Sequence, residues 1–254
     1  MNLAEAVTVG TPIWNAADAL ALMWESFRKH HGEVSWLVAD DGSTDGAADY
    51  AKTHASRYWL GEDRTFGRRL DELVRATGTP YLLLTDSDVE FLGPVVVELL
   101  KLLEADEQAW AVGGPWNVYH APEYHRVDIS CALVRISMVR EIQEWFSFAP
   151  CRIYSGGDYY LDTGGQVWRA ARLRGWSALE TGLVREQVLH VGGLSALWDE
   201  AQPEGRQQER RLAYKYLQER LRRLRAGDQR RDDLQWVPTW GWRYREDVWT
   251  TASG

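Results

Sequence analysis

Short runs of apolar and β-branched residues alternate with longer amphipathic stretches in the first half of the chain. The runs at residues 7–10, 34–39 and 81–85 have the length of buried strands. The stretches at residues 16–30 and 67–76 carry apolar residues at helical spacing instead. This alternation predicts an α/β fold with a mostly parallel central sheet, right-handed crossovers and helices on both faces.

Particular residues mark where several of these elements should begin or end. Residues 11–12, Thr-Pro, are expected to break the first strand into a loop, and Asn15 is expected to cap the following helix. The acidic turn at residues 40–45 is predicted to cap a helix that starts near Gly46. A short third strand is predicted at residues 58–60.

The second half of the chain continues the alternation with less regular spacing. Helices are expected at residues 95–104 and, with Ser137 as the N-cap, through residue 145. A Gly-rich acidic loop at residues 154–165 is expected to lead into a helix that ends at Arg174. Further strands are predicted at residues 109–114, 129–135 and 188–193.

The composition changes after Pro203, where a basic helix at residues 206–225 is predicted, followed by an aromatic tail. We favour packing of the narrow apolar stripe of this helix on the domain or on a second subunit. The alternative is association with a membrane surface that bears anionic lipid. We expect the tail to pack on the body of the protein or to cover a substrate cleft. The stripe consists of Ala213, Leu217, Leu221 and Leu224, and the tail contains Trp236, Trp240, Trp242 and Trp249.

Length and composition limit the class of protein. A chain of 254 residues that is 45% hydrophobic can bury a full core, and a net charge of −8 argues against a nucleic-acid partner. Cys131 and Cys151 match no disulfide framework and no metal motif. The sequence shows no signal-type segment and no apolar run of membrane length, so a cytoplasmic protein is expected, with peripheral membrane association left open. The 14 Trp residues are a hint of stacking on sugars, because indole rings do this as well as filling cores.

Two carboxylates follow the predicted strand at residues 81–85. Asp86 and Asp88 are two positions apart, so an extended backbone points both to the same side. Ionised carboxylates at the C-terminal end of a parallel strand repel each other unless a cation lies between them. The Asp40-Asp41 turn leaves its own strand at the same edge, where open α/β sheets bind ligands. The pattern indicates a divalent metal that holds a phosphorylated ligand, and a solvated Asp-Ser-Asp turn is the alternative.

Three sequence blocks together resemble a known family. Residues 8–12 with Asn15, residues 38–45 and the Asp86-Ser87-Asp88 block are similar, in order and spacing, to the GT-A fold glycosyltransferases and specifically to the inverting family 2. The resemblance covers roughly residues 6–195. It implies a Rossmann-like GT-A glycosyltransferase domain at residues 1–200, with residues 201–254 as a helical, Trp-rich extension.

The resemblance also implies what the protein does and how it binds its donor. The expected enzyme is a hexosyltransferase-type glycosyltransferase that uses Mn²⁺ or Mg²⁺ and a UDP-, GDP- or dTDP-sugar. The segment at Thr11 and Pro12 would lie along the nucleotide base, and Asp41 would hydrogen-bond the base or the ribose. Either Arg68 or Arg69 would contact the base or a phosphate.

The family pattern further implies the metal ligands. Asp88 would ligate the cation that bridges the two donor phosphates, and Asp86 would contact the ribose or donor sugar and help to hold the cation. Ser87, between them, is assigned to the donor contacts. His190 falls at the position of a family histidine near the metal and diphosphate, and a purely structural histidine is the alternative.

The base that activates the acceptor is the point at which this sequence departs from the family. Family members usually have a Glu-Asp pair before a helix that ends in Gly-aromatic. Gly175 and Trp176 match the helix end, but no Glu-Asp pair precedes them. Asp162 lies closer to the expected register and is predicted to be the base, with Asp158 as an orienting residue or acceptor ligand. A helix N-cap is the alternative role for Asp162.

The missing Glu-Asp pair leaves open a catalytically inactive nucleotide-sugar or glycan-binding module of the same fold. A phosphatase-type Asp-x-Asp nucleophile is disfavoured, because Glu90 stands where that motif has Thr or Val. A nucleotidyltransferase is disfavoured as well, since no Gly-rich basic loop follows the first strand. The acceptor stays open between a glycan, a peptide and a small molecule, and inversion is implied by the resemblance alone.

Overall fold

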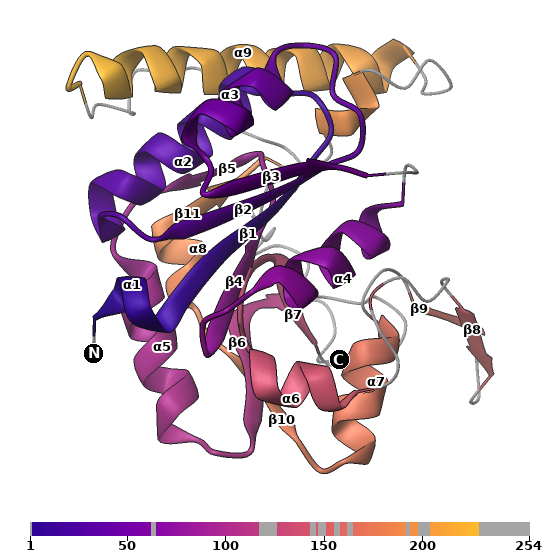
Figure 1. Cartoon of the computed structure of the whole chain (residues 1–254). Helices are drawn as coiled ribbons and strands as arrows, with labels where there is room; N and C mark the ends of the chain where they lie inside the picture. Colours follow the sequence, from indigo (N-terminus) through magenta and orange to yellow (C-terminus); the bar gives the residue numbers. More distant parts are fainter. Residues whose placement is uncertain are drawn as a thin grey trace, which may run out of the picture.

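The computed structural model describes residues 2–61, 65–116, 126–142, 146, 151–154, 158–161, 165–191, 194–197 and 204–228. Its centre is a mostly parallel sheet, as predicted (Figure 1). The strands of this sheet are β1 (Val7–Ile13), β2 (Ser35–Asp40), β3 (Arg57–Leu60), β4 (Tyr81–Thr85), β6 (Ala109–Trp116), β7 (Arg126–Arg135) and β10 (Ser177–Glu180). Among the described residues their order is β10-β6-β7-β4-β1-β2-β3, and β7 alone runs antiparallel to its neighbours, β4 and β6.

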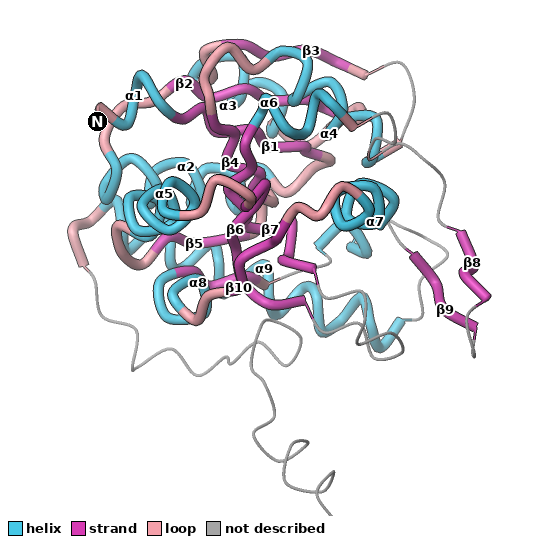
Figure 2. The backbone as a smooth tube through the Cα atoms, turned by 90° about the horizontal axis from the view of Figure 1, so that it is seen from below, coloured by secondary structure: helices cyan, strands magenta, loops and turns pink. Residues whose placement is uncertain are grey.

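Helices cover both faces of this sheet, because strands that are apolar on both sides need a partner layer on each. In Figure 2, α2 and α5 lie on one side of the central strands and α4 and α7 on the other. β1 is buried at every position, in agreement with its run of apolar and β-branched residues. The helices are α1 (Leu3–Ala6), α2 (Ala17–His31), α3 (Ala47–His54), α4 (Phe66–Ala76), α5 (Val95–Ala105), α6 (Ile136–Glu141), α7 (Gly165–Leu173), α8 (Leu183–Gln187) and α9 (Glu204–Arg225), with a short 3₁₀ helix at Leu194–Leu197.

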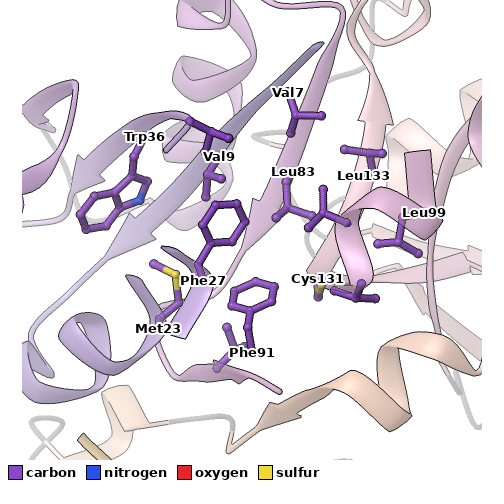
Figure 3. Packing of buried hydrophobic residues seen from close by; sticks show 14 of the residues in the cluster. Val7, Val9, Met23, Phe27, Trp36, Leu83, Phe91, Leu99, Cys131 and Leu133 are labelled. Carbon is purple, nitrogen blue, oxygen red and sulfur yellow. The ribbon is translucent and has the colours of Figure 1, made fainter. Parts of the chain in front are cut away.

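One apolar core lies between the sheet and α2. Val9, Leu83 and Leu133 project from three strands of the sheet toward Phe27 of α2 and Phe91 (Figure 3). All five side chains are at most 1% exposed, and the two phenylalanine rings meet edge to face at 5.2 Å between centroids. This packing fixes α2, whose N-terminus reaches the carboxyl edge of the sheet.

Two small antiparallel sheets supplement the central one. β5 (Val89–Phe91) pairs with β11 (Val188–His190), and β8 (Cys151–Tyr154) pairs with β9 (Asp158–Leu161). The prediction of a loop from residue 154 was therefore wrong for residues 158–161. The run of aromatic and branched residues there favours a strand over a loop.

The C-terminal helix α9 packs within the chain, on α2. Ala213, Leu217 and Leu221 of its apolar stripe are at most 4% exposed and lie against Ala19 and Leu22 of α2. Packing on the domain, one of the two favoured possibilities, is thus observed for this stripe. The tail tryptophans lie outside the described residues. Of the helices that the structure describes, none combines the length and apolar character needed to cross a membrane.

Three predicted boundaries were wrong. β1 continues through Thr11 and Pro12 to Ile13 and does not break at these residues. Its pairing with β4 ends at Gly10, so the missing N–H of Pro12 costs no hydrogen bond to β4. α2 begins after Ala16 rather than at an Asn15 cap. Likewise α6 begins at residue 136 and ends at residue 141, without a Ser137 cap, and residues 143–145 lie outside the described part.

Candidate functional site

A pocket opens at the carboxyl edge of the sheet, where β1, β2 and β4 end side by side. In parallel α/β sheets this edge is where ligands bind. Its polar lining is Asp41, Asp86, Ser87 and Asp88, and its apolar lining is Pro12, Ile13, Trp14, Ala16, Phe66 and Leu194. The pocket therefore combines acidic groups with aromatic and aliphatic walls.

The acidic group after β4 is completed by a histidine from a distant part of the chain. Pairing of β11 with β5 places His190 opposite Val89, next to Asp88. His190 Nε2 lies 3.3 Å from Asp88 Oδ1 and 3.4 Å from Asp86 Oδ2. One potential ligand atom from each of the three residues lies within 4.8 Å of the other two. The structure thus brings together the three residues predicted to hold a metal.

The charges in this group depend on one another. Burial opposes the protonated form of His190, but hydrogen bonds and charges of Asp86 and Asp88 outweigh it and raise the pKa of the imidazole well above its usual value. Burial would likewise raise the pKa of Asp88, but His190 outweighs burial and lowers it. A protonated imidazole can thus supply the positive charge that two adjacent carboxylates require, and a cation that His190 ligates would displace this proton. Two carboxylates and one imidazole are also a donor set suited to Mn²⁺ or Mg²⁺ with additional oxygen ligands.

A further buried carboxyl group, Asp128 of β7, interacts electrostatically with this group and was not predicted. It is 4% exposed, and its Oδ1 accepts a hydrogen bond from Ser130 N at 2.8 Å. Burial raises the pKa of Asp128, and the charge of His190 opposes this change. The sequence offered only a weak signal, because Asp128 stands just before the strand predicted at residues 129–135.

Adjacent aspartates at the end of β2 have different environments. Asp40 is fully buried; its Oδ1 accepts hydrogen bonds from Gly42 N and from the N and Oγ of Ser43, and its Oδ2 accepts one from the Tyr58 hydroxyl. Asp40 therefore holds the turn in shape. Unlike Asp40, Asp41 lines the pocket, and it is the residue that was predicted to contact the donor.

Arg69 contacts Asp41 from behind the pocket. Its side chain is 1% exposed, with Nε 3.3 Å from Asp41 Oδ1 and Nη1 3.1 Å from Glu72 Oε2. The guanidinium passes so close to Gly61 that a Cβ there would lie 1.3 Å from Nη1. Arg68, the other predicted arginine, is exposed on the first turn of α4. Of the two, Arg68 is the one accessible to a ligand in solution.

The connection between β1 and α2 has a strained backbone. Asn15 and Ala16 both adopt left-handed conformations, with φ of 61° and 65°, which residues with a Cβ rarely do. Asn15 N donates to Ser43 Oγ at 2.7 Å, and Asn15 Oδ1 accepts from Thr44 N at 2.7 Å. Asp45 accepts hydrogen bonds from the first residues of both α2 and α3. These bonds tie the β1 and β2 connections together along one wall of the pocket.

Thr11 and Pro12, which were predicted to lie along the nucleotide base, have different environments. Pro12 lines the pocket. The Thr11 side chain is fully buried, and its Oγ1 accepts a hydrogen bond from Trp36 Nε1 at 3.0 Å.

Asp158 and Asp162 are the carboxylates that were predicted to act on the acceptor side. Asp158 is the first residue of β9, where its backbone pairs with Tyr154. Asp162 lies outside the described residues. Their catalytic roles stay predictions.

Apart from Pro12, the apolar lining of the pocket was not predicted from the sequence. Trp14 follows the Thr11-Pro12 block, and Phe66 stands at the start of α4, so proximity to a predicted binding segment was the only available signal. Leu194 belongs to no motif and reaches the pocket because β11 returns to β5.

A mostly parallel α/β sheet with an Asp-x-Asp group and a pocket at its carboxyl edge is the arrangement of the GT-A fold glycosyltransferases, which use nucleotide sugars. The family model for glycosyl transferase family 2 matches residues 8–155, more than half of the chain. The protein belongs to this family. No curated protein matches the sequence.

Two solved structures are similar to this chain at low sequence identity, and the first of them supports the fold. One is the mannosyltransferase PcManGT from Pyrobaculum calidifontis in complex with GDP-Man and Mn²⁺, with a TM-score of 0.54, 15% identity, and coverage of 87% of this chain and 74% of that one. Another is residues 1–349 of S. aureus TarS, with a TM-score of 0.49, 10% identity, and coverage of 84% and 71%.

Proposed function

We propose that this protein transfers a hexose from a nucleotide diphosphate sugar to an acceptor hydroxyl, with a divalent cation and with inversion at the anomeric carbon. The observation that supports this most directly is the Asp86, Asp88 and His190 group at the edge of the pocket. The presence of GDP-Man and Mn²⁺ in the structurally similar mannosyltransferase is consistent with the proposal.

Asp88 and His190 would hold the cation, with Asp86 as a third ligand or as a contact to the donor sugar. Their potential ligand atoms are already close together, so binding requires little rearrangement of the backbone. When bound, the cation offsets the negative charge that develops on the departing diphosphate. Asp88 Oδ2 is also oriented by the backbone N–H of Leu194 at 3.4 Å.

The donor nucleotide would occupy the part of the pocket between β1 and α4. Pro12, Trp14 and Phe66 offer flat apolar surfaces against which a base can stack. Asp41, held from behind by Arg69, would accept a hydrogen bond from the base or ribose. Arg68 would reach a phosphate or the base from α4. Thr11 would act indirectly, by supporting the strand that carries Pro12.

Asp162 would accept the proton of the acceptor hydroxyl as that oxygen attacks the anomeric carbon. A carboxylate within hydrogen-bond reach is sufficient for this step. Attack from the face opposite the diphosphate inverts the configuration, and a single base on the acceptor side suffices. Asp158 would orient the acceptor.

Calorimetric titration tests the donor site. UDP, GDP and dTDP are titrated, with and without Mn²⁺, into wild type and Asp88→Ala. We expect one nucleotide to bind with Mn²⁺ and its affinity to collapse in the variant. Failure of all three nucleotides to bind wild type under both conditions would contradict the proposal.

Turnover distinguishes an enzyme from a binding module. Asp162→Ala is expected to abolish donor hydrolysis or transfer while nucleotide affinity stays at the wild-type value. Nucleotide binding by wild type without any turnover, across an acceptor screen, would favour a catalytically inactive module instead.

A further inference from the structure

We infer that Arg220 of α9 is a positioning residue for the metal ligands, so that the C-terminal helix is a functional part of the donor site. The inference rests on the proposed function, because it presumes that Asp86, Asp88 and His190 bind a cation. α9 lies outside residues 8–155, the part of the chain that matches the family. α9 runs along the top of the molecule in Figure 1, and its apolar stripe packs on α2.

Arg220 forms a two-pronged ion pair with Glu90 of β5. Its Nε donates to Glu90 Oε2 at 3.1 Å, and its Nη2 donates to Oε1 at 2.6 Å. The two side chains are 4% and 3% exposed. A fork of this kind has essentially one low-energy geometry, unlike an apolar contact, which tolerates sliding.

Glu90 is close to the metal ligands along the backbone and across the small sheet. It follows Asp88 by two residues, and in the β5–β11 pair it lies opposite Leu189, the residue before His190. Fixing the Glu90 carboxylate therefore fixes the strand pair that brings Asp88 and His190 together.

A second contact between α9 and the site lies beyond β11. Arg210 Nη1 approaches Val191 O, the residue after His190, at 3.5 Å. Val191 N in turn donates to Asp88 O at 3.1 Å. Val191 and Leu194 are buried in one cluster with Ala213 and Leu217 of α9. The helix thus contacts β5, which directly follows Asp88, and Val191, which directly follows His190.

The test compares Mn²⁺ binding by full-length variants, with calorimetry for affinity and electron paramagnetic resonance for the environment of the bound ion. Arg220→Met removes the fork, and Arg220→Lys keeps the positive charge without the fork. Arg225→Met is the matched control, because Arg225 of α9 also forms an ion pair with another element, through Glu25 of α2, but its side chain is 53% exposed. Leu103→Ala in α5 removes a fully buried side chain and so controls for lost stability alone. All measurements are made below the melting transition of each variant.

We expect Arg220→Met to bind Mn²⁺ about tenfold or more weakly, as is usual when a group that orients metal ligands is removed, with a changed resonance spectrum. Arg220→Lys should give a smaller loss, and both controls should bind as wild type does. If Arg220→Met does not fold, Arg220→Lys decides the question. Wild-type Mn²⁺ affinity and spectrum in the folded Arg220 variants would overturn the inference and leave the proposed function intact. Absence of Mn²⁺ binding by wild type would instead overturn the proposed metal site and the inference with it.

Discussion

Arg69 Nε lies 3.3 Å from Asp41 Oδ1, at the point where a buried cation meets a carboxylate that lines the pocket. The same guanidinium contacts Glu72, whose Oε2 also accepts a hydrogen bond from Trp59 Nε1 at 2.7 Å. This chain of contacts runs from β3 through α4 to the end of β2. It gives Asp41 a fixed orientation before any ligand arrives, and preorganisation of this kind reduces the cost of binding.

Gly61→Ala should disturb this orientation, because the new Cβ would lie 1.3 Å from Arg69 Nη1 and the buried guanidinium would have to move. We expect a loss of about 1–3 kcal/mol in the free energy of unfolding, together with weaker nucleotide binding. Gly78→Ala is the control, because a Cβ there meets no atom within 4 Å. Urea unfolding and nucleotide titration measure the two effects. Equal behaviour of the two variants would show that Arg69 is not constrained as described.

Asp40→Ala and Asp41→Ala should separate stability from binding. Asp40 is fully buried and accepts several hydrogen bonds, so its removal should cost about 2–4 kcal/mol of unfolding free energy by leaving buried donors unpaired. Asp41→Ala removes one carboxylate beside the buried Arg69 while Glu72 stays in contact with it, so we expect a smaller loss of about 1–2 kcal/mol together with weaker nucleotide binding. Denaturant titrations and calorimetry on both variants give the comparison. The reverse order of stability losses would contradict the assignment of Asp40 to the turn.

His31 should make the protein less stable in mild acid. Its ring packs on Phe27 at 4.6 Å between centroids, and burial, assisted by the charge of His30, lowers its pKa from the usual 6.5 to about 4. Because the unfolded chain binds this proton more readily, stability is intact above pH 6.5 and falls as the pH drops toward 4. The loss should reach about 2–3 kcal/mol.

His31→Phe should remove this part of the pH dependence while keeping the contact with Phe27. His54→Phe, on the exposed end of α3, is the control and should leave the dependence unchanged. Unfolding free energies measured between pH 7 and pH 4 test the prediction. A difference between wild type and His31→Phe that does not change with pH would contradict it.

Mn²⁺ should stabilise the folded protein through the pocket ligands. At 100 times its dissociation constant, an ion that binds only the folded state adds about 2.7 kcal/mol, which corresponds to a rise in melting temperature of about 5–10 °C for a chain of this size. Asp88→Asn should abolish the shift. Melting curves with Mn²⁺ and with a chelator measure it, and an equal shift in the variant would place the ion elsewhere.

The sequence by itself determined the elements near the site and the identity of the acidic motif. Uninterrupted apolar runs specify strands that are buried on both faces, and these runs, with the helices between them, were sufficient to predict the parallel sheet. Asp86 and Asp88 follow the end of a predicted strand, so their place at the carboxyl edge followed from chain direction alone. Local signals such as Pro12 and Ser137 led to wrong predictions of where β1 ends and where α6 begins, because the effect of a proline or a cap depends on which neighbouring strand or helix is present.

Only the tertiary structure decided what surrounds those carboxylates. The family resemblance implied His190 near the metal, but its contact with Asp88 depends on the pairing of β11 with β5, and pairing between distant segments leaves no local trace in the sequence. Arg69 is buried and Arg68 is exposed, although the two residues are neighbours on α4. The orientation of this helix against the sheet decides which of the two side chains is buried. The same holds for Arg220, one of many arginines in a basic helix until packing on α2 placed it against Glu90. Contacts between residues far apart in the chain depend on how whole elements pack, and that packing determines which charged groups face the pocket.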